Sequence, residues 1–301
     1  MATTGFIGLG TIGGPMAARI AASNNKLEVY DLNAEAIAPL TALGASAVSS
    51  IAEMAQACAT IFLSLPGPAQ IEDVVLGADG LLAHAGSALK TIVDLSTNSV
   101  SLNRTIAERA RSQGVAYLDA PVSGGKVAAE KGKLAVMVGG DEAAYETARP
   151  LIGCFGEHLF YMGESGSGTL TKLVNNQIFL CASVLIQEGF VMGAKAGMDP
   201  TDLLQVIKKS SAGTLMERAP LVLSRKFDMD LFSLAIAAKD VGVALKSADD
   251  VGASMPMTAA AHGVYEQALA QGLADEDFFA TVKVLEGLAD CELAPLRKPE
   301  K

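Results

Sequence analysis

The sequence predicts an α/β domain with a mostly parallel sheet, followed by an all-α domain that a long helix joins to the first. Up to Gly163, short apolar segments of strand length alternate with segments of helical periodicity. Such alternation is typical of a parallel sheet with helices on both faces. After Gly163, apolar residues recur at helical intervals and no segment resembles a strand. We therefore expect domains at residues 1–164 and 165–301.

The composition suits a folded protein with two domains. Half of the 301 residues are hydrophobic, and the net charge is −10, which argues against general nucleic-acid binding. Met1 leads directly into the first predicted strand, which leaves no room for a signal peptide. No uninterrupted apolar run reaches the ~18 residues of a membrane span. We expect a cytoplasmic protein without a membrane segment.

Cysteine and histidine offer little chemistry in this chain. The four cysteines lie far apart and form no CxxC pair, so we expect reduced, unpaired thiols. Each of the three histidines lacks a second ligand at metal-binding spacing. We therefore expect no metal site and no catalytic histidine.

A glycine-rich turn follows the first predicted strand, which begins near residue 5. Gly8, Gly10 and Gly13 have GxGxxG spacing, and a helix is expected over 15–22. Gly8 permits the tight turn, Gly10 lets the backbone approach a pyrophosphate, and Gly13 lets the helix pack against the strand. The backbone at Thr11 and Ile12 lies at the helix start, where N–H groups face phosphates. The pattern predicts a Rossmann-type dinucleotide site.

The second predicted strand, 27–30, ends at Asp31, which is 18 residues after Gly13. A carboxylate at this position accepts hydrogen bonds from the adenosine ribose and repels a 2′-phosphate. The next three residues include no Arg or Lys that would bind such a phosphate. NAD is therefore expected rather than NADP. The alternative is that Asp31 merely begins a turn with Asn33.

The rest of the first domain continues the alternation. Ligands in such sheets bind at the carboxyl ends of the strands, so Leu65, Pro66, Ser96 and Thr97, which follow two strands, are expected beside the cofactor. Further strands are expected at 60–64, 91–94, 115–119, 133–138 and 158–162, and helices at 34–43, before Gly44, and at 142–151.

The second domain is expected to be entirely helical. A long helix runs from about 166 to 196, and the next begins after Asp199, a capping residue, with Pro200 at its first position. Later helices are expected at 201–208, 237–251, 258–271 and 276–288, before a polar, frayed tail at 294–301.

Lys172 is the expected catalytic residue. Hydride transfer from an alcohol to NAD requires a group that takes the hydroxyl proton, and histidine is not expected to do so. Lys172 lies early in the long helix with Asn176 four residues later, so both occupy one helix face among apolar neighbours. Desolvation and the positive nicotinamide would lower the pKa of a lysine there. The alternative is an ordinary exposed lysine.

Four motifs in order resemble the β-hydroxyacid dehydrogenases, the family of 3-hydroxyisobutyrate dehydrogenase and tartronate semialdehyde reductase. The resemblance extends from Gly5 to about Val284. The motifs are GFIGLGTIGGPM at 5–16, DAPVSGG at 119–125, GSGTLTKLVNN at 166–176, and Lys239-Asp240 with Phe232 before it.

The resemblance implies a role for each matching residue. Lys172 would be the general acid/base for a small 3-hydroxy acid or its semialdehyde, and Asn176 would hold this substrate. Ser123, Gly124 and Gly125 would bind the substrate carboxylate, for which backbone N–H groups at a Gly-Gly turn are suited. Ser96 and Thr97 would lie near the nicotinamide, and Phe232 and Lys239 would close over the cofactor. A homodimer or homotetramer is also expected. The alternatives are a plain turn at 123–125 and a core aromatic at Phe232.

Some positions depart from the family pattern. Lys126 and Lys133 replace smaller or hydroxyl residues, and segment 210–216 lacks the tryptophan of hydroxyisobutyrate-type members. Segment 217–221 more closely resembles the tartronate semialdehyde or threonate branch, where Arg218 would meet a second polar end of the substrate.

Two alternative functions use the same scaffold. Imine reduction is disfavoured because Lys172 is retained, and a dinucleotide-binding sensor without turnover is disfavoured because both Lys172 and Asn176 are retained.

Overall fold

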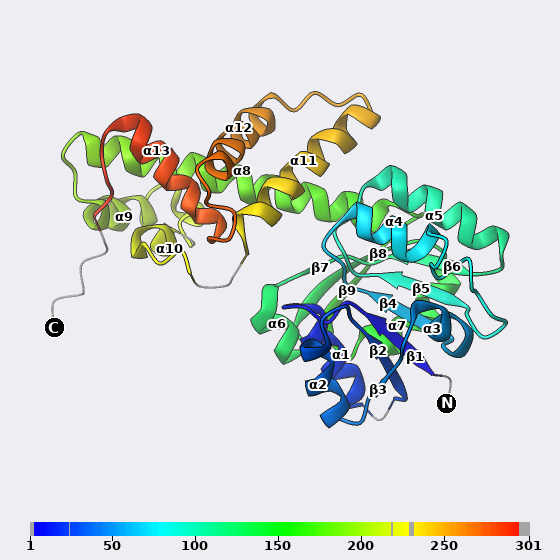
Figure 1. Ribbon diagram of the computed structural model, residues 1–301. Helices are drawn as coiled ribbons and strands as arrows, with labels where there is room; N and C mark the ends of the chain where they lie inside the picture. The colour runs from blue at the N-terminus through cyan, green and yellow to red at the C-terminus, as the bar shows by residue number, and fades with distance from the viewer. Residues whose placement is uncertain (1–2, 24, 218, 229–231, 295–301) are drawn as a thin grey trace. The chain divides into compact units, whose positions relative to one another are not determined.

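The computed structural model describes residues 3–23, 25–217, 219–228 and 232–294. The chain divides into two units, Met1–Leu173 and Val174–Lys301 (Figure 1). The first unit is an α/β domain and the second is helical, as the sequence predicts. A single long helix, α8 (Ser167–Lys195), begins in the first unit and continues into the second.

The described residues of the first unit form a nine-stranded, mostly parallel sheet. Its order is β3-β2-β1-β4-β5-β6-β8-β7, with β9 paired to β8. The pairs from β3 to β6 are all parallel, whereas β8 runs antiparallel to β6 and β7. The strands are β1 (Thr4–Ile7), β2 (Leu27–Tyr30), β3 (Ser46–Ala47), β4 (Thr60–Leu63), β5 (Thr91–Asp94), β6 (Ala116–Asp119), β7 (Val122–Ser123), β8 (Leu134–Gly139) and β9 (Gly156–Gly163).

Helices cover both faces of this sheet (Figure 1). Because neighbouring residues of a strand point to opposite faces, Phe6 enters the core beneath α1, α6 and α7, and Ile7 enters the core beneath α3, α4 and α5. Each face therefore has a continuous apolar core. The helices of this unit are α1 (Gly13–Ala21), α2 (Ala34–Ala42), α3 (Ile51–Ala57), α4 (Pro68–Leu76), α5 (Val100–Ser112), α6 (Gly125–Lys131) and α7 (Glu142–Ile152).

The sequence analysis did not identify α3, α4, α5 or α6. In α5 the buried positions are Val100, Asn103, Ile106 and Ala110, a stripe that includes a polar and a small residue. Such a stripe is a weak apolar signal. The caps were the better signal, because Ser50 and Ser99 accept hydrogen bonds from the first turns of α3 and α5.

Helix α8 is the central element of the second unit. By length and composition it is also suited to cross a membrane, but its residues Leu180, Val184, Phe190 and Val191 are buried among other helices of this unit. Of the most apolar 18-residue window of α8, 39% is buried within the protein. The surrounding helices are α9 (Pro200–Lys208), α10 (Ala219–Ser224), α11 (Leu234–Asp250), α12 (Pro256–Ala270) and α13 (Thr281–Ala289), with 3₁₀ turns at Gly213–Leu215 and Phe278–Ala280.

The helix boundaries in this unit agree largely with the sequence. Asp199 caps α9 by accepting the N–H of Thr201 at 2.8 Å, and Pro200 takes the first helical position. The predicted helix at 276–288 is divided, however, because the side chain of Asp277 caps a 3₁₀ turn before α13 begins. Most of the tail that we expected to fray lies outside the described residues.

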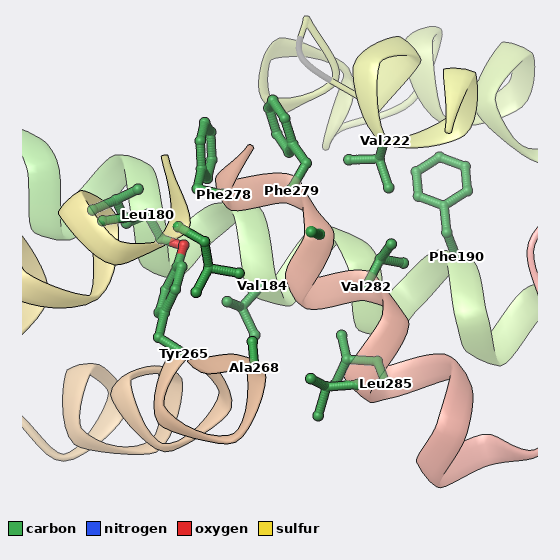
Figure 2. Packing of buried hydrophobic residues seen from close by; sticks show 14 of the residues in the cluster. Leu180, Val184, Phe190, Val222, Tyr265, Ala268, Phe278, Phe279, Val282 and Leu285 are labelled. Carbon is green, nitrogen blue, oxygen red and sulfur yellow. The ribbon is translucent and has the colours of Figure 1, made fainter. Parts of the chain in front are cut away.

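Aromatic side chains fill the core of the second unit (Figure 2). The rings of Phe278 and Phe279 lie 4.0 Å apart. Tyr265 is fully buried, and its hydroxyl donates to the Leu180 carbonyl of α8 at 3.1 Å. Phe190 extends from α8 toward Val222 and Val282 (Figure 2). This core holds the second half of α8 in place.

We expect Phe190→Ala to lower the free energy of unfolding by about 3–5 kcal/mol, because it removes a buried ring and leaves a cavity. Urea denaturation followed by circular dichroism measures the change. Met257→Ala on α12 is the control, since Met257 is 73% exposed and its truncation should change stability by less than about 0.5 kcal/mol. Equal effects of the two substitutions would contradict this description of the core.

Candidate active site

The carboxyl ends of five parallel strands lie in one row at the edge of the first unit's sheet. The register pairs Ile7 with Tyr30 and Leu63, Leu63 with Asp94, and Asp94 with Asp119. The loops that carry most of the predicted site residues therefore start from a common edge. β1 lies between β2 and β4, where the strand order reverses, and this is where open α/β sheets bind ligands.

The three glycines after β1 differ in what surrounds them. A Cβ on Gly13 would lie 2.0 Å from the carbonyl oxygen of Gly8, and one on Gly8, which has a φ of +90°, would lie 2.2 Å from that of Ser64. These two glycines are required by the protein's own packing. A Cβ on Gly10 would meet no protein atom within 4 Å. The open space beside Gly10 fits the close approach of a phosphate.

The start of α1 suits an anion. Ile12, the N-cap residue, provides no side-chain hydrogen bond, and no acidic residue occupies the first turn. Thr11 beside it is exposed. An uncapped helix start presents backbone N–H groups and the positive end of the helix dipole. Together with the space at Gly10, this chemistry fits the pyrophosphate of a dinucleotide.

Asp31 joins the end of β2 to the glycine-rich loop. Its Oδ2 accepts the N–H of Leu9 at 2.6 Å, and its Oδ1 accepts the N–H of Asn33 at 2.7 Å. Asp31 therefore does make the turn with Asn33 that we considered as the alternative. Each carboxylate oxygen retains a further lone pair. The turn thus fixes the orientation of a carboxylate that can still accept the hydroxyls of a ribose.

Ser96 links the ends of β4 and β5. Its Oγ accepts the N–H of Leu65 at 2.9 Å, which joins two of the residues expected beside the cofactor. Pro66 follows as an exposed residue, and Thr97 is half-buried. The backbone N–H of Ser96 donates to Asp94 Oδ1 at 3.0 Å. The loop after β5 is therefore held by the last residue of its own strand.

A buried polar network that the sequence analysis missed lies behind these loops. The Tyr117 hydroxyl is 2.8 Å from Asp94 Oδ2 and 2.9 Å from Asn103 Oδ1. Asn98 Nδ2 donates to Asn103 Oδ1 and, at 3.4 Å, to Asp94. Burial raises the pKa of both Asp94 and Tyr117. The one sign of this network in the sequence is that two apolar strands end in an acidic residue, Asp94 and Asp119.

Asp119 connects this network to α8. Its Oδ1 accepts the N–H of Gly166 and its Oδ2 accepts the N–H of Thr169, each at 2.7 Å, and Asn103 Nδ2 donates to Thr169 Oγ1 at 2.6 Å. Asp119 is 0% exposed. Gly168 lets the helix approach the sheet, because a Cβ there would lie 2.2 Å from the Met137 carbonyl oxygen. The first turn of α8 is therefore fixed to the sheet.

Burial raises the pKa of Asp119 to about 6, even though its hydrogen bonds from Gly166 and Thr169 lower that pKa. The folded protein consequently binds a proton more strongly than the unfolded chain between pH 3.8 and about 6. Ionisation of Asp119 thus reduces the free energy of unfolding as the pH rises through this range, by about 3 kcal/mol in all. The charged form of this anchor is maintained at a cost in stability.

Lys172 follows Thr169 by three residues on α8 and is half-buried. Ser123 ends β7, and Gly124 and Gly125 have positive φ angles of +135° and +71° at the start of α6. This segment is therefore the entry to a helix rather than a plain turn. A Cβ on Gly124 would lie 2.7 Å from that of Ala128, whereas Gly125 has open space.

In the second unit, Asp240 joins two predicted site residues. Asn176 Nδ2 donates to Asp240 Oδ2 at 2.7 Å, and Lys239 Nζ forms an ion pair with Oδ1 at 3.0 Å. Asp240 is 1% exposed. The Phe232 ring packs edge-on to Phe278 with centroids 5.9 Å apart, which is the core contact we considered as its alternative. The sequence analysis quoted Asp240 in a motif but assigned it no role.

The remaining expectations concern the cysteines and Arg218. All four cysteines are free thiols, as expected, and Cys58 is buried, where its Sγ donates to Glu28 Oε2 at 3.3 Å. Arg218 lies outside the described residues.

Two family models together match most of the chain. The NAD binding domain of 6-phosphogluconate dehydrogenase matches residues 3–163, and the NAD-binding domain of NADP-dependent 3-hydroxyisobutyrate dehydrogenase matches residues 166–285. The first match contains the glycine-rich loop and Asp31. The second contains Lys172 and Asn176.

Relatives are similar over nearly their whole length. A 2-(hydroxymethyl)glutarate dehydrogenase of Eubacterium barkeri is 36% identical over 94% of this chain and 94% of its own. An NAD-dependent L-serine dehydrogenase of Pseudomonas aeruginosa is 35% identical over 93% and 97%, respectively. The solved structure of Mycobacterium tuberculosis 3-hydroxyisobutyrate dehydrogenase with L-serine has a TM-score of 0.85, at 29% identity over 95% of this chain and 99% of that one.

Two glycine substitutions separate packing from ligand binding. We expect Gly13→Ala to destabilise the protein, because its Cβ would overlap the Gly8 carbonyl oxygen. Gly10→Ala should leave the melting temperature of the ligand-free protein within about 3 °C, since its Cβ meets no protein atom, yet should weaken NAD binding roughly tenfold or more. Thermal melts and calorimetric titration with NAD measure both effects. Unchanged NAD affinity in Gly10→Ala would contradict the placement of the phosphates at this glycine.

Proposed function

The chain belongs to the β-hydroxyacid dehydrogenase family, and from that premise we propose that it is an NAD-dependent oxidoreductase that interconverts a small 3-hydroxy acid and its semialdehyde. The observation that carries this proposal is the match to hydroxyacid dehydrogenases over nearly the whole chain, with Lys172 and Asn176 both retained. In this proposal residues 1–164 bind the cofactor, and residues 165–301 carry the catalytic helix.

The relatives' substrates suggest the chemical class. 2-(Hydroxymethyl)glutarate, L-serine and 3-hydroxyisobutyrate, which appear in the names of the three similar proteins, share the skeleton HOCH₂–CH(R)–COO⁻. In each, the carbon of the primary alcohol is bonded directly to the carbon that carries the carboxylate. We propose that this chain oxidises such an alcohol to the aldehyde or reduces the aldehyde. The side group R is what distinguishes the members of the class.

The proposed cofactor is NAD. Gly8, Gly10 and Gly13, with the start of α1 at Thr11 and Ile12, would hold its pyrophosphate. Asp31 would accept the ribose hydroxyls, and its charge would repel the 2′-phosphate of NADP. By the family resemblance, Leu65, Pro66, Ser96, Thr97, Phe232 and Lys239 would contact the rest of the cofactor. When bound, NAD supplies a nicotinamide carbon that accepts a hydride.

Lys172 would transfer the proton. In oxidation its neutral amine accepts the hydroxyl proton while the hydride leaves the same carbon, so the alcohol becomes an aldehyde. In reduction the protonated amine returns the proton to the new alkoxide oxygen. Ser123 and the N–H groups of Gly124 and Gly125 would bind the carboxylate, and Asn176 would hold the substrate. Such positioning lowers the barrier because the reacting atoms are already aligned.

We also propose a cytoplasmic homodimer or homotetramer in which α8 contributes to the subunit contact. Several large apolar residues on α8 are substantially exposed within one chain, among them Ile178 at 60%, Leu185 at 59% and Met192 at 73%. A helix that is apolar on all sides is ordinarily covered. Exposed apolar surface of this kind commonly marks a contact with another protein, and a second copy would cover it.

We expect NAD reduction with at least one HOCH₂–CH(R)–COO⁻ acid, and a loss of roughly 10²–10⁴-fold in kcat in Lys172→Ala, because proton transfer then lacks its general base. Absorbance of the reduced nicotinamide measures the rate across a panel of such acids, with NAD and with NADP. Lys246→Ala, at an exposed lysine of α11, is the matched control and should retain the wild-type rate.

Full activity in Lys172→Ala would remove Lys172 from the mechanism. NAD binding without turnover of any acid in the panel would instead reject the substrate class. A higher kcat/KM with NADP than with NAD would reject the role given to Asp31.

The oligomer proposal predicts that the solution mass is at least twice the 30.9 kDa of one chain. Met192→Glu should lower this mass, because a charge at the contact would be desolvated. Leu43→Glu, at a residue of the first unit that is 55% exposed, should not. Light scattering after size-exclusion chromatography measures the mass. A wild-type monomer with full activity would refute the proposal.

A further inference from the structure

The start of α8 is capped differently from the starts of other helices in this chain. Helices α3, α5, α7 and α9 are each capped by the residue immediately before them, which are Ser50, Ser99, Asp141 and Asp199. The N–H groups of Gly166 and Thr169 instead donate to Asp119, which is 47 and 50 residues earlier in the sequence. The cap of α8 therefore comes from a strand of the central sheet.

This arrangement fixes the position of the helix as well as its hydrogen bonds. Both carboxylate oxygens are used, so the helix cannot rotate about its axis without losing one bond. Gly168 and Gly139 bring the two backbones into contact, since a Cβ on either would lie within 3 Å of the other's backbone nitrogen. Asn103 adds a third hydrogen bond through Thr169. The first turn of α8 consequently has one position on the sheet.

We propose that Asp119 is a positioning residue for the reaction, because it sets the rotation and height of the helical turn that precedes Lys172. The proposal rests on the proposed function, in which Lys172 is the general acid/base. Lys172 follows Thr169 by three residues, less than one helical turn. A shift of the anchored turn would therefore carry Lys172 with it. A displacement of ~1 Å at a catalytic group can cost on the order of 100-fold in rate.

The anchor should also depend on pH. Both oxygens of Asp119 accept a backbone N–H, and protonation converts one of them into a hydroxyl, which is a weaker acceptor than a carboxylate oxygen, so protonation should weaken the anchor. The groups that surround Asp119 include Asp94 on β5, Tyr117 on β6, Asn103 on α5 and Thr169 on α8, none of which carries a positive charge. The guanidinium of Arg104 on α5 lies beside Gly166, whose N–H donates to Asp119. Burial, with a smaller contribution from Asp94, raises the pKa of Asp119 to about 6.

The test compares Asp119→Asn with the wild type. An amide offers one acceptor oxygen and turns an N–H group toward the second backbone N–H, so the anchored turn should shift. We expect kcat to fall roughly 10- to 100-fold, while KM for NAD changes less than threefold. In the direction of aldehyde reduction, where the protonated amine of Lys172 is the active form, we also expect wild-type kcat to decline below about pH 6 as Asp119 is protonated, and this decline to be absent in the variant.

Asp141→Asn is the matched control, because Asp141 caps α7 by accepting the N–H of Ala144 at 2.8 Å. It should retain the wild-type kcat and pH profile. An Asp119→Asn enzyme with a kcat within twofold of the wild type and the same acid decline would overturn the proposal. If Asp119 only stabilised the fold, Asp119→Asn would lower the melting temperature and keep the decline of kcat at acid pH. That outcome would also overturn the proposal.

Hydrogen exchange provides a measurement that is independent of turnover. Amides in the peptide 164–173 should exchange faster in Asp119→Asn at pH 7, and in the wild type at pH 5 after correction for intrinsic rates. The amides of α7 should exchange at unchanged rates under both conditions. If no acid of the panel is oxidised, the proposed function fails, and this exchange pattern still tests the anchor. Equal protection of 164–173 in both proteins would overturn it, even if the variant folds poorly elsewhere.

Discussion

The buried carboxylate of Asp119 is the contact on which the geometry of the first unit depends. It joins the end of β6 to the start of α8, and through Thr169 and Asn103 it reaches α5 and the network around Asp94. Burial makes its ionised form costly, by about 3 kcal/mol. This cost is what remains after two backbone N–H groups of the helix start, which would otherwise be unsatisfied, have lowered the pKa by donating to the carboxylate. The ionised Asp119 therefore lowers the free energy of unfolding while it fixes the position of α8.

Five glycines of this unit fall into two groups, and for Gly8, Gly10 and Gly13 this division was already expected from the GxGxxG spacing. Gly8, Gly13 and Gly168 bring two backbones into contact, and a Cβ on any of them would overlap a carbonyl oxygen. Gly10 faces open space, and so does Gly125 at the start of α6. The first group is explained by packing within the protein. Gly125 is explained by its φ of +71°, a conformation that favours glycine whatever the surrounding space, and Gly10 is explained if another molecule, such as a dinucleotide, approaches the backbone.

Asp240 in the second unit resembles Asp119, because it is also a buried aspartate with a contact at each carboxylate oxygen. It is almost completely buried, and its two oxygens orient Asn176 and Lys239. Asp240 contacts these two residues directly, whereas Asp119 contacts the helical turn that precedes Lys172. Removing Asp240 would break the ion pair with Lys239, whereas removing Asp119 would take away the acceptor of two backbone N–H groups at the start of α8.

The sequence alone determined the fold class, most of the strands, the helical second unit and the glycine-rich turn, because these depend on apolar periodicity and on spacing within one segment. It did not reveal the short strands β3 and β7, the helices α3, α4, α5 and α6, or the roles of Asp94, Asp119 and Asp240. The residue type alone does not show whether an aspartate is buried or exposed. The hydrogen-bond partners of Asp119 also lie about 50 residues later in the sequence. Only the tertiary structure brings β6 to the start of α8. The contacts of a strand end with a distant helix follow from packing of the whole unit, which no local pattern encodes.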